Sequence, residues 1–534
     1  TLYFLAAMIT YAGVYDTALP QSFEPPESIH PLVRESYGEI ARRIEAALAT
    51  GSRAEVPRAR HRARAAADKD PAPATPDPAT PGTGTVPDDG KIARAQSPEG
   101  GDRALSEDAP EGTPATAAAS SGRGDASEIR ADPPRHRADT GTGDRGQGAT
   151  TSAAPPGLAD PKLAVVLSGL ADWAVNHPFI DLMKTARPWT GHSRDEWGRW
   201  DDDALRDAGH IDRAGWPLGL PEEATRLESY VLTDQPAALD GLAGQYILRW
   251  RGAGHLEVTG RSRLVSHRPG EIVFNYTPGD GPVAIVVKES DPEGTGDHIR
   301  DITLIRAEHL PLHEAGAIFN PDWIARVRDL RAVRFMGWMQ INNSDIENWS
   351  DRPRPADMTY AERGVPVEVL VQLANEIGAD PWFNMPHKAD DAYVRRFATY
   401  VRDHLDPRLR AHVEYSNEVW NWLFEQAIWA KDQAEARWGE EATGDAWMQF
   451  AGARAAEMAG LWREVFGAAA EDRLRTVIGV HTGWPGLEAA ALEAPLWVAE
   501  GNAPPAERFD QYAVTGYFGR EMGGDDGAPR IKTW

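Results

Sequence analysis

The stretch DDAYVRRFATYVRDHLDPRLRAHVEYSNEVWN, residues 390–421, decides the fold because a helix pattern in it leads directly into a strand pattern. Phe397, Val401 and Leu405 recur every four residues, so one face of the predicted helix is apolar and can lie against a sheet. The β-like run that follows ends in an Asn-Glu pair. This stretch therefore predicts one helix-and-strand unit with polar side chains at the end of its strand.

Similar units lie on both sides of this stretch. Residues 319–343 and 367–387 combine a helix pattern and a strand pattern in the same order, and further strand candidates start near residues 162, 475 and 511. Strict alternation of helix and strand implies parallel strands with right-handed crossover connections. We therefore expect an α/β fold built on a parallel sheet.

Two parallel architectures fit such alternation, and the strand ends discriminate between them. A doubly wound sheet that binds nucleotides carries a Gly-rich phosphate turn, but the sequence contains neither GxGxxG nor GxxxxGK. In a (β/α)8 barrel the active site is built at the carboxyl ends of the strands. Polar and aromatic residues follow the predicted strands, namely Asp172, Trp173, Trp338, Gln340, Asn342, Asn384, His387, Asn417, Glu418, His481 and Tyr517. We therefore predict a TIM-type (β/α)8 barrel.

The rest of the chain divides into segments of different composition. An Ala/Pro/Gly-rich stretch with almost no aromatic residues cannot bury enough apolar surface to fold, so we expect a long disordered linker upstream of the barrel. Short alternating runs such as YILRWR and EIVFNYT, separated by turn residues, predict a β-sandwich inserted between the first and second barrel strands. The predicted segments are a helical fragment of an upstream domain (1–48), the linker (49–160), the start of the barrel (161–224), the inserted β-sandwich (225–306) and the remainder of the barrel with strands two to six (307–534).

Composition argues against several classes of function. The formal net charge of −25 argues against a nucleic-acid binder, which needs a basic face for the phosphates. The sequence has no cysteine, no HExxH motif and no EF-hand loop, so we expect no metal site and no cofactor. No apolar run is long enough to cross a bilayer. We expect a monomeric, secreted protein whose signal peptide is not visible in this sequence.

Glu418 is the candidate for chemistry. Cleavage of a glycosidic bond needs one carboxylic acid that protonates the leaving oxygen and a second carboxylate that attacks the sugar or activates water. Glu418 would take the first role, and Asn417 would donate to a sugar hydroxyl. Trp420, Trp422 and Tyr517 would supply flat surfaces for sugar rings and would favour the protonated form of the acid.

Other strand-end residues are candidates for substrate contacts, and each also has a structural interpretation. His387 could cap a turn, Arg334 could be a strand-end ion-pair partner, and many of the 19 tryptophans could pack in the core. The aromatic residues Tyr230, Trp250 and Tyr276 of the predicted β-sandwich form no clear planar set and are expected to be structural. The candidate substrate-binding residues are Asn417, Arg334, His387, Asn384, Trp173, Trp338, Trp420, Trp422, His481 and Tyr517.

From the start of the predicted barrel onward, the sequence resembles a family of bacterial exported proteins often described as cellulose-binding or cellulase-like, in the runs PFIDLMKTARPW, VRFMGWMQINNS, NWSDR, GADPWFNMPH and HVEYSNEVWN. The predicted barrel is in turn similar to the clan of retaining (β/α)8 glycosidases that carry an Asn-Glu pair after strand four. The resemblance implies that Glu418 is the acid/base and that Asn417 is its hydroxyl-binding neighbour. It also implies that Arg334 lies beneath the nucleophile, that His387 contacts sugar from the third strand and that Tyr517 is a sixth-strand aromatic residue.

The sequence departs from this clan in one respect. The nucleophile of the clan is a Glu at the end of strand seven, whereas this sequence stops at Trp534, shortly after the predicted strand six. We therefore expect a barrel truncated after strand six, lacking its nucleophile and inactive in this form. Residues 1–48 resemble the carboxy-terminal tail of SGNH-type esterase domains.

Three functional hypotheses are open at this point. The first is a glycoside-hydrolase-like protein that acts on a polysaccharide or an oligosaccharide. The second is a non-catalytic carbohydrate-binding protein, for example one that binds cellulose, which keeps the groove without productive chemistry. The third is an adhesin or matrix protein whose esterase-like and barrel parts are joined by the linker.

Overall fold

The computed structural model of the chain describes residue 42 and residues 160–516. Apart from residues 42 and 160, the predicted helical fragment (1–48) and the predicted linker (49–160) lie outside the described residues. Tyr517 lies outside them as well. The described part of the chain covers the predicted β-sandwich and the predicted barrel up to its sixth strand.

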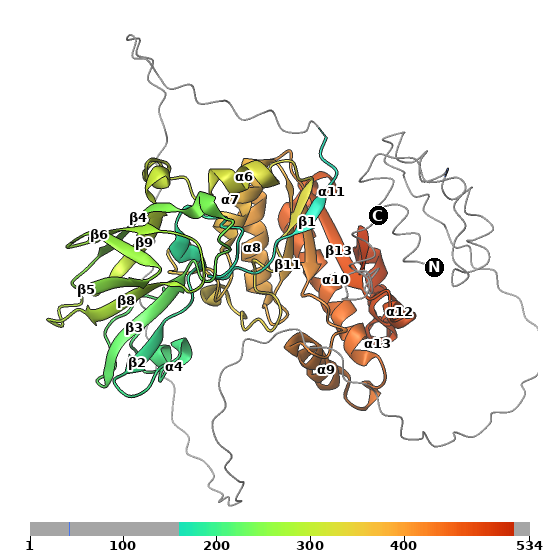
Figure 1. The fold of residues 1–534 in the computed structure, drawn as a ribbon. Helices are drawn as coiled ribbons and strands as arrows, with labels where there is room; N and C mark the ends of the chain where they lie inside the picture. Colours follow the sequence, from blue (N-terminus) through green and yellow to red (C-terminus); the bar gives the residue numbers. More distant parts are fainter. Residues whose placement is uncertain (1–41, 43–159, 517–534) are drawn as a thin grey trace, which may run out of the picture. The chain divides into compact units, whose positions relative to one another are not determined.

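Six parallel strands form one curled sheet of the kind found in half a barrel (Figure 1). Each strand is hydrogen-bonded to the next one along the chain within this sheet, in the order β1-β10-β11-β12-β13-β14. A doubly wound sheet reverses its strand order at a switch point, and this sheet does not. The strands are β1 (Ala164–Val166), β10 (Ala332–Arg334), β11 (Asp380–Met385), β12 (Ala411–Tyr415), β13 (Leu474–Val480) and β14 (Gln511–Val514).

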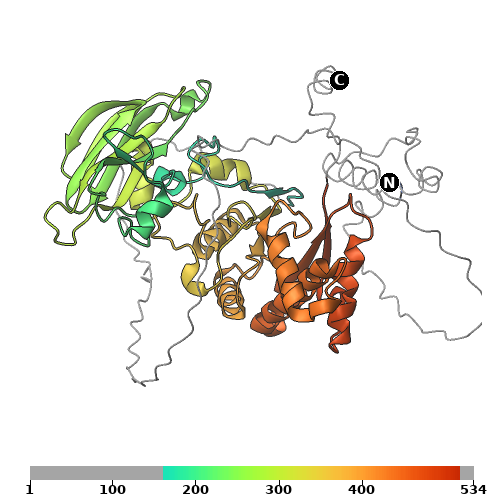
Figure 2. The same cartoon turned by 90° about the horizontal axis from the view of Figure 1, so that it is seen from below.

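Helices cover one face of this sheet (Figures 1 and 2). The connections contain α7 between β10 and β11, α8 between β11 and β12, α9, α10 and α11 between β12 and β13, and α12 and α13 between β13 and β14. The helices from residue 310 onward are α5 (Leu310–Glu314), α6 (Pro321–Val327), α7 (Val367–Ile377), α8 (Asp391–His404), α9 (Glu425–Trp438), α10 (Ala446–Phe466), α11 (Ala470–Arg473), α12 (Leu487–Glu493) and α13 (Pro495–Ala499).

Alternation along β12 explains why its two faces differ. Val413 and Tyr415 point into the hydrophobic core shared with the helices. His412 and Glu414 alternate with them and therefore point to the opposite face of the sheet. One face of the strand is thus apolar and covered, and the other carries ionisable side chains.

Helix α8 shows the predicted periodicity. Its amino terminus is capped by Asp390, whose carboxylate accepts a hydrogen bond from the backbone N–H of Tyr393 at 2.6 Å. Phe397, Val401 and Leu405 are all buried in the core beneath the sheet. The four-residue spacing seen in the sequence is therefore the stripe by which α8 packs against the strands.

Two antiparallel sheets of four strands lie between β1 and β10 in the chain (Figure 1). Their strand orders are β2-β3-β8-β5 and β6-β7-β4-β9. Side chains from both sheets, such as Leu227 and Phe274, meet in a second hydrophobic core. The elements of this region are β2 (Thr190–Ser193), α4 (Asp202–Asp207), β3 (Ala224–Val231), β4 (Gly244–Arg251), β5 (Gly254–Gly260), β6 (Ser262–Arg268), β7 (Glu271–Tyr276), β8 (Val283–Ser290) and β9 (Arg300–Arg306). Short 3-10 turns are η1 (Leu182–Thr185), η2 (Asp240–Leu242), η3 (Ala307–His309), η4 (Trp349–Asp351), η5 (Gly439–Glu441), η6 (Gly467–Ala469) and η7 (Pro505–Arg508).

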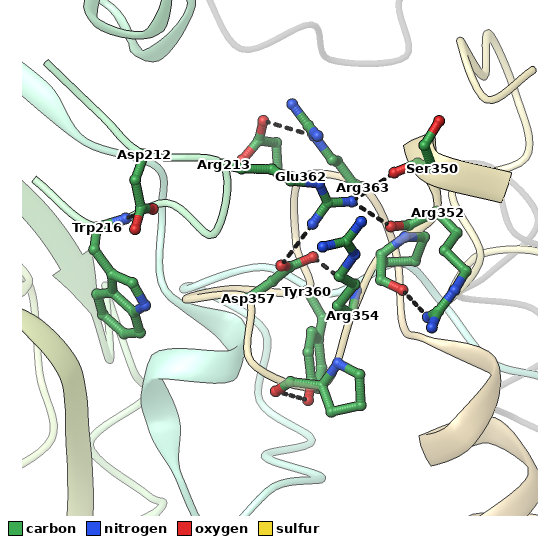
Figure 3. A network of polar contacts seen from close by, with 12 residues as sticks. Asp212, Arg213, Trp216, Ser350, Arg352, Arg354, Asp357, Tyr360, Glu362 and Arg363 are labelled. Atoms are coloured by element: carbon green, nitrogen blue, oxygen red, sulfur yellow. Dashed lines mark hydrogen bonds and ion pairs between the residues drawn. The ribbon is translucent and has the colours of Figure 1, made fainter. Parts of the chain in front are cut away.

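A polar network ties the segment after α4 to the long connection between β10 and α7 (Figure 3). Arg213 donates from Nη2 to the backbone carbonyls of Ser350 at 2.8 Å and Arg352 at 2.9 Å. Its Nη1 lies 3.6 Å from a carboxylate oxygen of Asp357. Because three acceptors of that connection converge on one guanidinium, the network holds the connection in place.

The observed sheet tests the predicted architecture. Its six parallel strands in sequential order confirm the α/β class and are consistent with a truncated barrel. The closed eight-stranded barrel and the insertion of a β-sandwich at 225–306 stay predictions. The antiparallel sheets already begin with β2 at Thr190, before the predicted boundary. Among the described residues, no helix combines the length and the apolar character that crossing a membrane requires.

Candidate functional site

Polar side chains gather on the face of the parallel sheet that is opposite the helices. Arg334 in β10, Trp382 and Asn384 in β11, and Glu414 in β12 alternate with core residues of the same strands. In the strand register, Arg334 pairs with Trp382, and Asn384 pairs with Glu414. The four side chains are therefore neighbours near the carboxyl ends of the middle strands.

Glu414 lies at the centre of this group. Its Oε2 accepts hydrogen bonds from Arg334 Nε at 3.1 Å and Nη2 at 2.7 Å, from Trp382 Nε1 at 2.9 Å and from Asn384 Nδ2 at 2.9 Å. The side chain of Glu414 is 8% exposed and that of Arg334 is 17% exposed. Buried charges occur in proteins where they are paired and hydrogen-bonded, and this carboxylate is both. The four bonds fix its position.

Arg334 connects this carboxylate to the predicted Asn-Glu pair. Its Nη2 also donates to Asn417 Oδ1 at 3.1 Å. Asn417 Nδ2 donates to Asn342 Oδ1 at 3.0 Å, and Gln426 Nε2 donates to the same oxygen and to the Asn417 carbonyl, both at 2.8 Å. The orientation of Asn417 is therefore set from both ends of its side-chain amide.

A strained turn carries the chain out of β12 and places Glu418. Ser416 has φ of 53° and Glu418 has φ of 43°, which is a region that residues other than glycine adopt rarely. Asn384 Nδ2 donates to the Ser416 carbonyl at 2.7 Å, and Asn421 Nδ2 donates to Glu418 Oε2 at 3.0 Å. Hydrogen bonds on both sides of the turn therefore hold this conformation.

A cavity of about 330 Å³ lies on this face of the sheet. The polar and aromatic residues of its wall are Arg334, Trp382, Glu414, Asn417, Glu418, Trp420 and Thr515. Gly479 of β13 also lines it, and a Cβ atom at this position would come within 2.9 Å of Glu414 Oε1. A larger residue there would press on the carboxylate, so the glycine keeps this side of Glu414 open.

Tryptophans surround the strand ends near the cavity. Trp420, which is 8% exposed, lines the cavity and meets the ring of His481 edge-on at 6.0 Å between centroids. The ring centroids of Trp422 and Trp447 lie 5.0 Å apart, and those of Trp447 and Trp484 lie 6.0 Å apart. Trp422 and Trp484 are exposed, so part of this aromatic group faces solvent.

Three predicted substrate contacts lie elsewhere. Trp338 is 1% exposed and stacks on Trp323 in the core. His387 is fully buried, neither of its ring nitrogens has a hydrogen-bond partner among the described residues, and burial lowers its pKa to about 4. Both rings are enclosed by core residues, so neither offers an open surface to a sugar. Trp173 is well exposed, but it lies against Arg187 and not on the cavity wall.

Glu414 is the central residue that the sequence patterns did not single out. In the run HVEYS it stands between Val413 and Tyr415, so a charge occupies the face of the strand opposite the core. Asn384 pairs with Glu414 in the preceding strand, and Arg334, which pairs with Trp382, lies on the same face of the strand before that. Polar residues at matched alternate positions of successive predicted strands were therefore the signal that could have revealed this group.

Within residues 160–516 and at residue 42, no group of three or more His, Asp or Glu side chains is arranged to hold a metal ion. The site is instead a set of hydrogen-bond donors, carboxylates and indoles, which suits a neutral polar ligand with apolar faces.

Comparisons with known proteins leave the family open. No protein-family model matches the chain, and no curated protein matches it. Among solved structures, the chain is similar to a β-glucosidase from Kluyveromyces marxianus in complex with glucose, with 12% identity, 41% of this chain and 26% of that chain covered, and a TM-score of 0.16. The chain thus spans about a quarter of that enzyme's length, and a likeness at this level carries no argument. The resemblance to exported cellulose-binding or cellulase-like proteins stays a prediction.

Proposed function

We propose that the chain is a glycoside-hydrolase-like protein that acts on a polysaccharide at the carboxyl ends of its parallel strands, with Glu418 as the acid/base. The observation that carries this proposal is the cavity, whose wall combines two carboxylates, an arginine, an amide and two indoles. Sugar rings have hydroxyl groups around their rims and C–H groups on their faces. A site that binds sugar rings therefore needs both hydrogen-bonding groups and flat apolar surfaces.

Each wall residue has a role in this proposal. Glu418 would protonate the leaving oxygen as the glycosidic bond breaks and would later take a proton from the incoming water. One N–H of the Asn417 amide is bonded to Asn342, so the second would donate to a sugar hydroxyl. Trp382 and Trp420 would lie against the faces of sugar rings.

Hydrolysis also requires a second carboxylate. Glu414 is the other carboxylate of the cavity wall, but its Oε2 is already bonded by side chains of three residues. We infer that Glu414 is a positioning residue, which orients Arg334 and through it Asn417. The nucleophile would then come from outside the described residues, as the sequence resemblance implies.

The engaged state of Glu414 also favours a second function. A cavity whose second carboxylate is held through Oε2 by an arginine, an indole and an amide would hold a polysaccharide without cleaving it, as a non-catalytic carbohydrate-binding protein does. The ligand class is the same in both cases. A polysaccharide ligand would place the protein outside the cell.

Release of reducing ends from soluble β-glucans and mannans tests the first function. We expect release by the full-length parent protein, in which the nucleophile is present, and a rate at least about 100-fold lower for its Glu418→Gln variant, because an amide cannot give up a proton to the leaving oxygen. Glu376→Gln is the matched control. Glu376 also follows an asparagine, but it lies exposed on α7 and does not line the cavity.

The possible outcomes separate the two functions. Equal rates for the parent and for Glu418→Gln would contradict the acid role. Absence of release by the parent, together with calorimetric binding of oligosaccharides that Trp420→Ala removes, would favour the binding function. Absence of both release and binding would contradict a carbohydrate ligand in this cavity.

A further inference from the structure

A row of aromatic and charged side chains follows the face of strand β3 that is turned away from its core. Leu227 and Val231 of β3 are buried in the core of the antiparallel sheets. The residues that alternate with them point to the opposite face. The β3 strip, as we name this row together with the acid that supports it, consists of Asp172, Trp173, Arg187, Trp197, Arg226, Glu228 and Tyr230.

One end of the β3 strip is built around Arg187. Its Nε and Nη2 donate to the two carboxylate oxygens of Asp172 at 3.1 and 2.9 Å, and Asp172 also accepts a hydrogen bond from Thr233. The guanidinium lies 5.6 Å from the ring centre of Trp173 and 5.1 Å from that of Tyr230. Trp173 is 57% exposed, so the arginine supports the indole while much of the ring faces water.

The other end of the strip repeats this construction. Trp197 stacks on the buried ring of His192 at 3.9 Å between centroids, and the guanidinium of Arg226 lies 5.1 Å from the Trp197 ring centre. Glu228 accepts hydrogen bonds from Arg226 and from the Tyr230 hydroxyl, so it joins the two ends. Trp197 is 67% exposed.

Charge along the strip is balanced internally. Arg187 is paired with Asp172, and Arg226 is paired with Glu228. Two arginines and two carboxylates leave no net charge to attract an ion or a charged polymer. The exposed parts that remain are two indoles held in place by their neighbours, and such rigid aromatic side chains lose little conformational entropy on binding.

The spacing of the strip indicates the size of its ligand. Arg226 and Tyr230 are four residues apart in β3, which separates them by roughly 13 Å at about 3.3 Å per residue. Trp197 contacts Arg226 at one end of this span, and Trp173 contacts Arg187, which also contacts Tyr230 at the other end. A ligand that touches both indoles therefore has to be a chain of several rings, because a single sugar ring cannot span this distance.

We propose that the β3 strip is a second carbohydrate-binding surface, which holds an uncharged polysaccharide chain against Trp173 and Trp197. The ligand class rests on the proposed function. The strip itself shares no residue with the cavity wall, so it binds its ligand independently of Glu418. Its role is to hold a long substrate on the protein, whereas the cavity acts on single linkages.

Affinity electrophoresis in gels that contain a neutral soluble polysaccharide, such as a β-glucan or a mannan, tests this proposal. We expect the parent to be retarded, and the double variant Trp173→Ala/Trp197→Ala to bind at least about tenfold more weakly, because two anchoring aromatic side chains are removed. Tyr512→Ala is the matched control, since Tyr512 is an exposed aromatic residue of β14 outside both sites. Trp420→Ala should keep at least part of the retardation, because the strip still holds the polysaccharide when the cavity wall is changed.

The result can overturn the proposal in several ways. Retardation of the double variant equal to that of the parent would do so, and so would loss of all retardation in Trp420→Ala alone. Binding seen only with anionic polysaccharides and removed by salt would contradict an uncharged ligand. A parent that no polysaccharide retards would overturn the strip, while release of reducing ends would still test the cavity separately. The urea midpoint of the double variant, expected to equal that of the parent, shows whether it is folded.

Discussion

The cavity wall and the β3 strip both combine carboxylates, arginines and indoles, but they differ in which of these side chains face water. In the cavity wall both members of the ion pair are largely covered, with Arg334 17% and Glu414 8% exposed. In the strip the acid Asp172 is 1% exposed, whereas its partner Arg187 is 40% exposed. The arginine–carboxylate pair is thus enclosed in the cavity wall, whereas in the β3 strip the arginine is open to water.

This difference separates two kinds of work. An enclosed network holds each polar atom in one place, which chemistry on a bound sugar requires. A strip with buried acids and exposed indoles anchors its side chains from below and leaves their flat surfaces available to a ligand. The enclosed network should therefore be more sensitive to substitution than the strip.

The largest effect is expected at the centre of the enclosed network. Glu414→Ala removes the acceptor of four hydrogen bonds and leaves Arg334 covered without its counterion. Breaking a buried ion pair by removing one partner lowers the free energy of unfolding by about 3–5 kcal/mol. Urea denaturation followed by circular dichroism measures this loss.

The control for this substitution is an exposed glutamate. Glu440→Ala should change the free energy of unfolding by no more than about 0.5 kcal/mol, because Glu440 is exposed. A loss below about 1 kcal/mol for Glu414→Ala would mean that water replaces the lost carboxylate at Arg334. The contrast between the two regions would then disappear.

A second effect concerns acid sensitivity beside the enclosed network. Burial, followed by the nearby charge of Lys388, lowers the pKa of His387 from 6.5 to about 4. Between these two values the unfolded chain binds a proton that the folded chain does not, so stability falls as the pH drops through this window. The loss should total about 3 kcal/mol and should appear as a falling urea midpoint.

His387→Phe should remove part of this pH dependence while keeping an aromatic ring in the core. Burial also lowers the pKa of His192 beneath the β3 strip, so a smaller slope of the same sign remains in the variant. The exposed His267 provides the comparison, and His267→Phe should follow the parent. Identical slopes for the parent and for His387→Phe would show that this histidine titrates alike in both states.

The fold could be predicted where local periodicity reports it. The four-residue spacing in α8 and the alternation in β12 are local, and both are present in the structure. Strands were also expected near residues 162, 475 and 511, where β1, β13 and β14 lie. The start of the antiparallel pairing was missed, because β2 is a short strand that pairs with β3, more than 30 residues further along the chain.

The site was predictable only in part, because a position at a strand end does not specify the direction of a side chain. Arg334, Asn417, Glu418 and Trp420 line one cavity, and their roles stay predictions. Trp338 also follows a strand, but its ring points into the core.

The expectation that functional residues follow strand ends also failed to place two residues, Trp173 and Glu414. Trp173 follows a strand as well, but the chain then leads into the antiparallel region, where Arg187 and Tyr230 meet it. Glu414 was overlooked because it lies within its strand and not after it. Side-chain direction and long-range pairing decided these cases, and neither is encoded in a short run of sequence.

The smallest effect is expected in the β3 strip, and it takes the form of an asymmetry. Arg187→Ala leaves the carboxylate of Asp172 buried with Thr233 as its remaining side-chain donor, so it should lower the free energy of unfolding by about 2 kcal/mol. Asp172→Asn keeps an acceptor for both partners, and Arg187 can turn to water, so its loss should be below about 1 kcal/mol. In the cavity wall, by contrast, Arg334→Ala and Glu414→Ala should have similar effects on the free energy of unfolding, since each leaves a covered charge behind.

Urea denaturation of the four variants measures the asymmetry in both ion pairs. An Asp172→Asn variant as unstable as Arg187→Ala would mean that the strip is as enclosed as the cavity wall, and its indoles would then lack the open, independently supported surface on which polysaccharide binding depends.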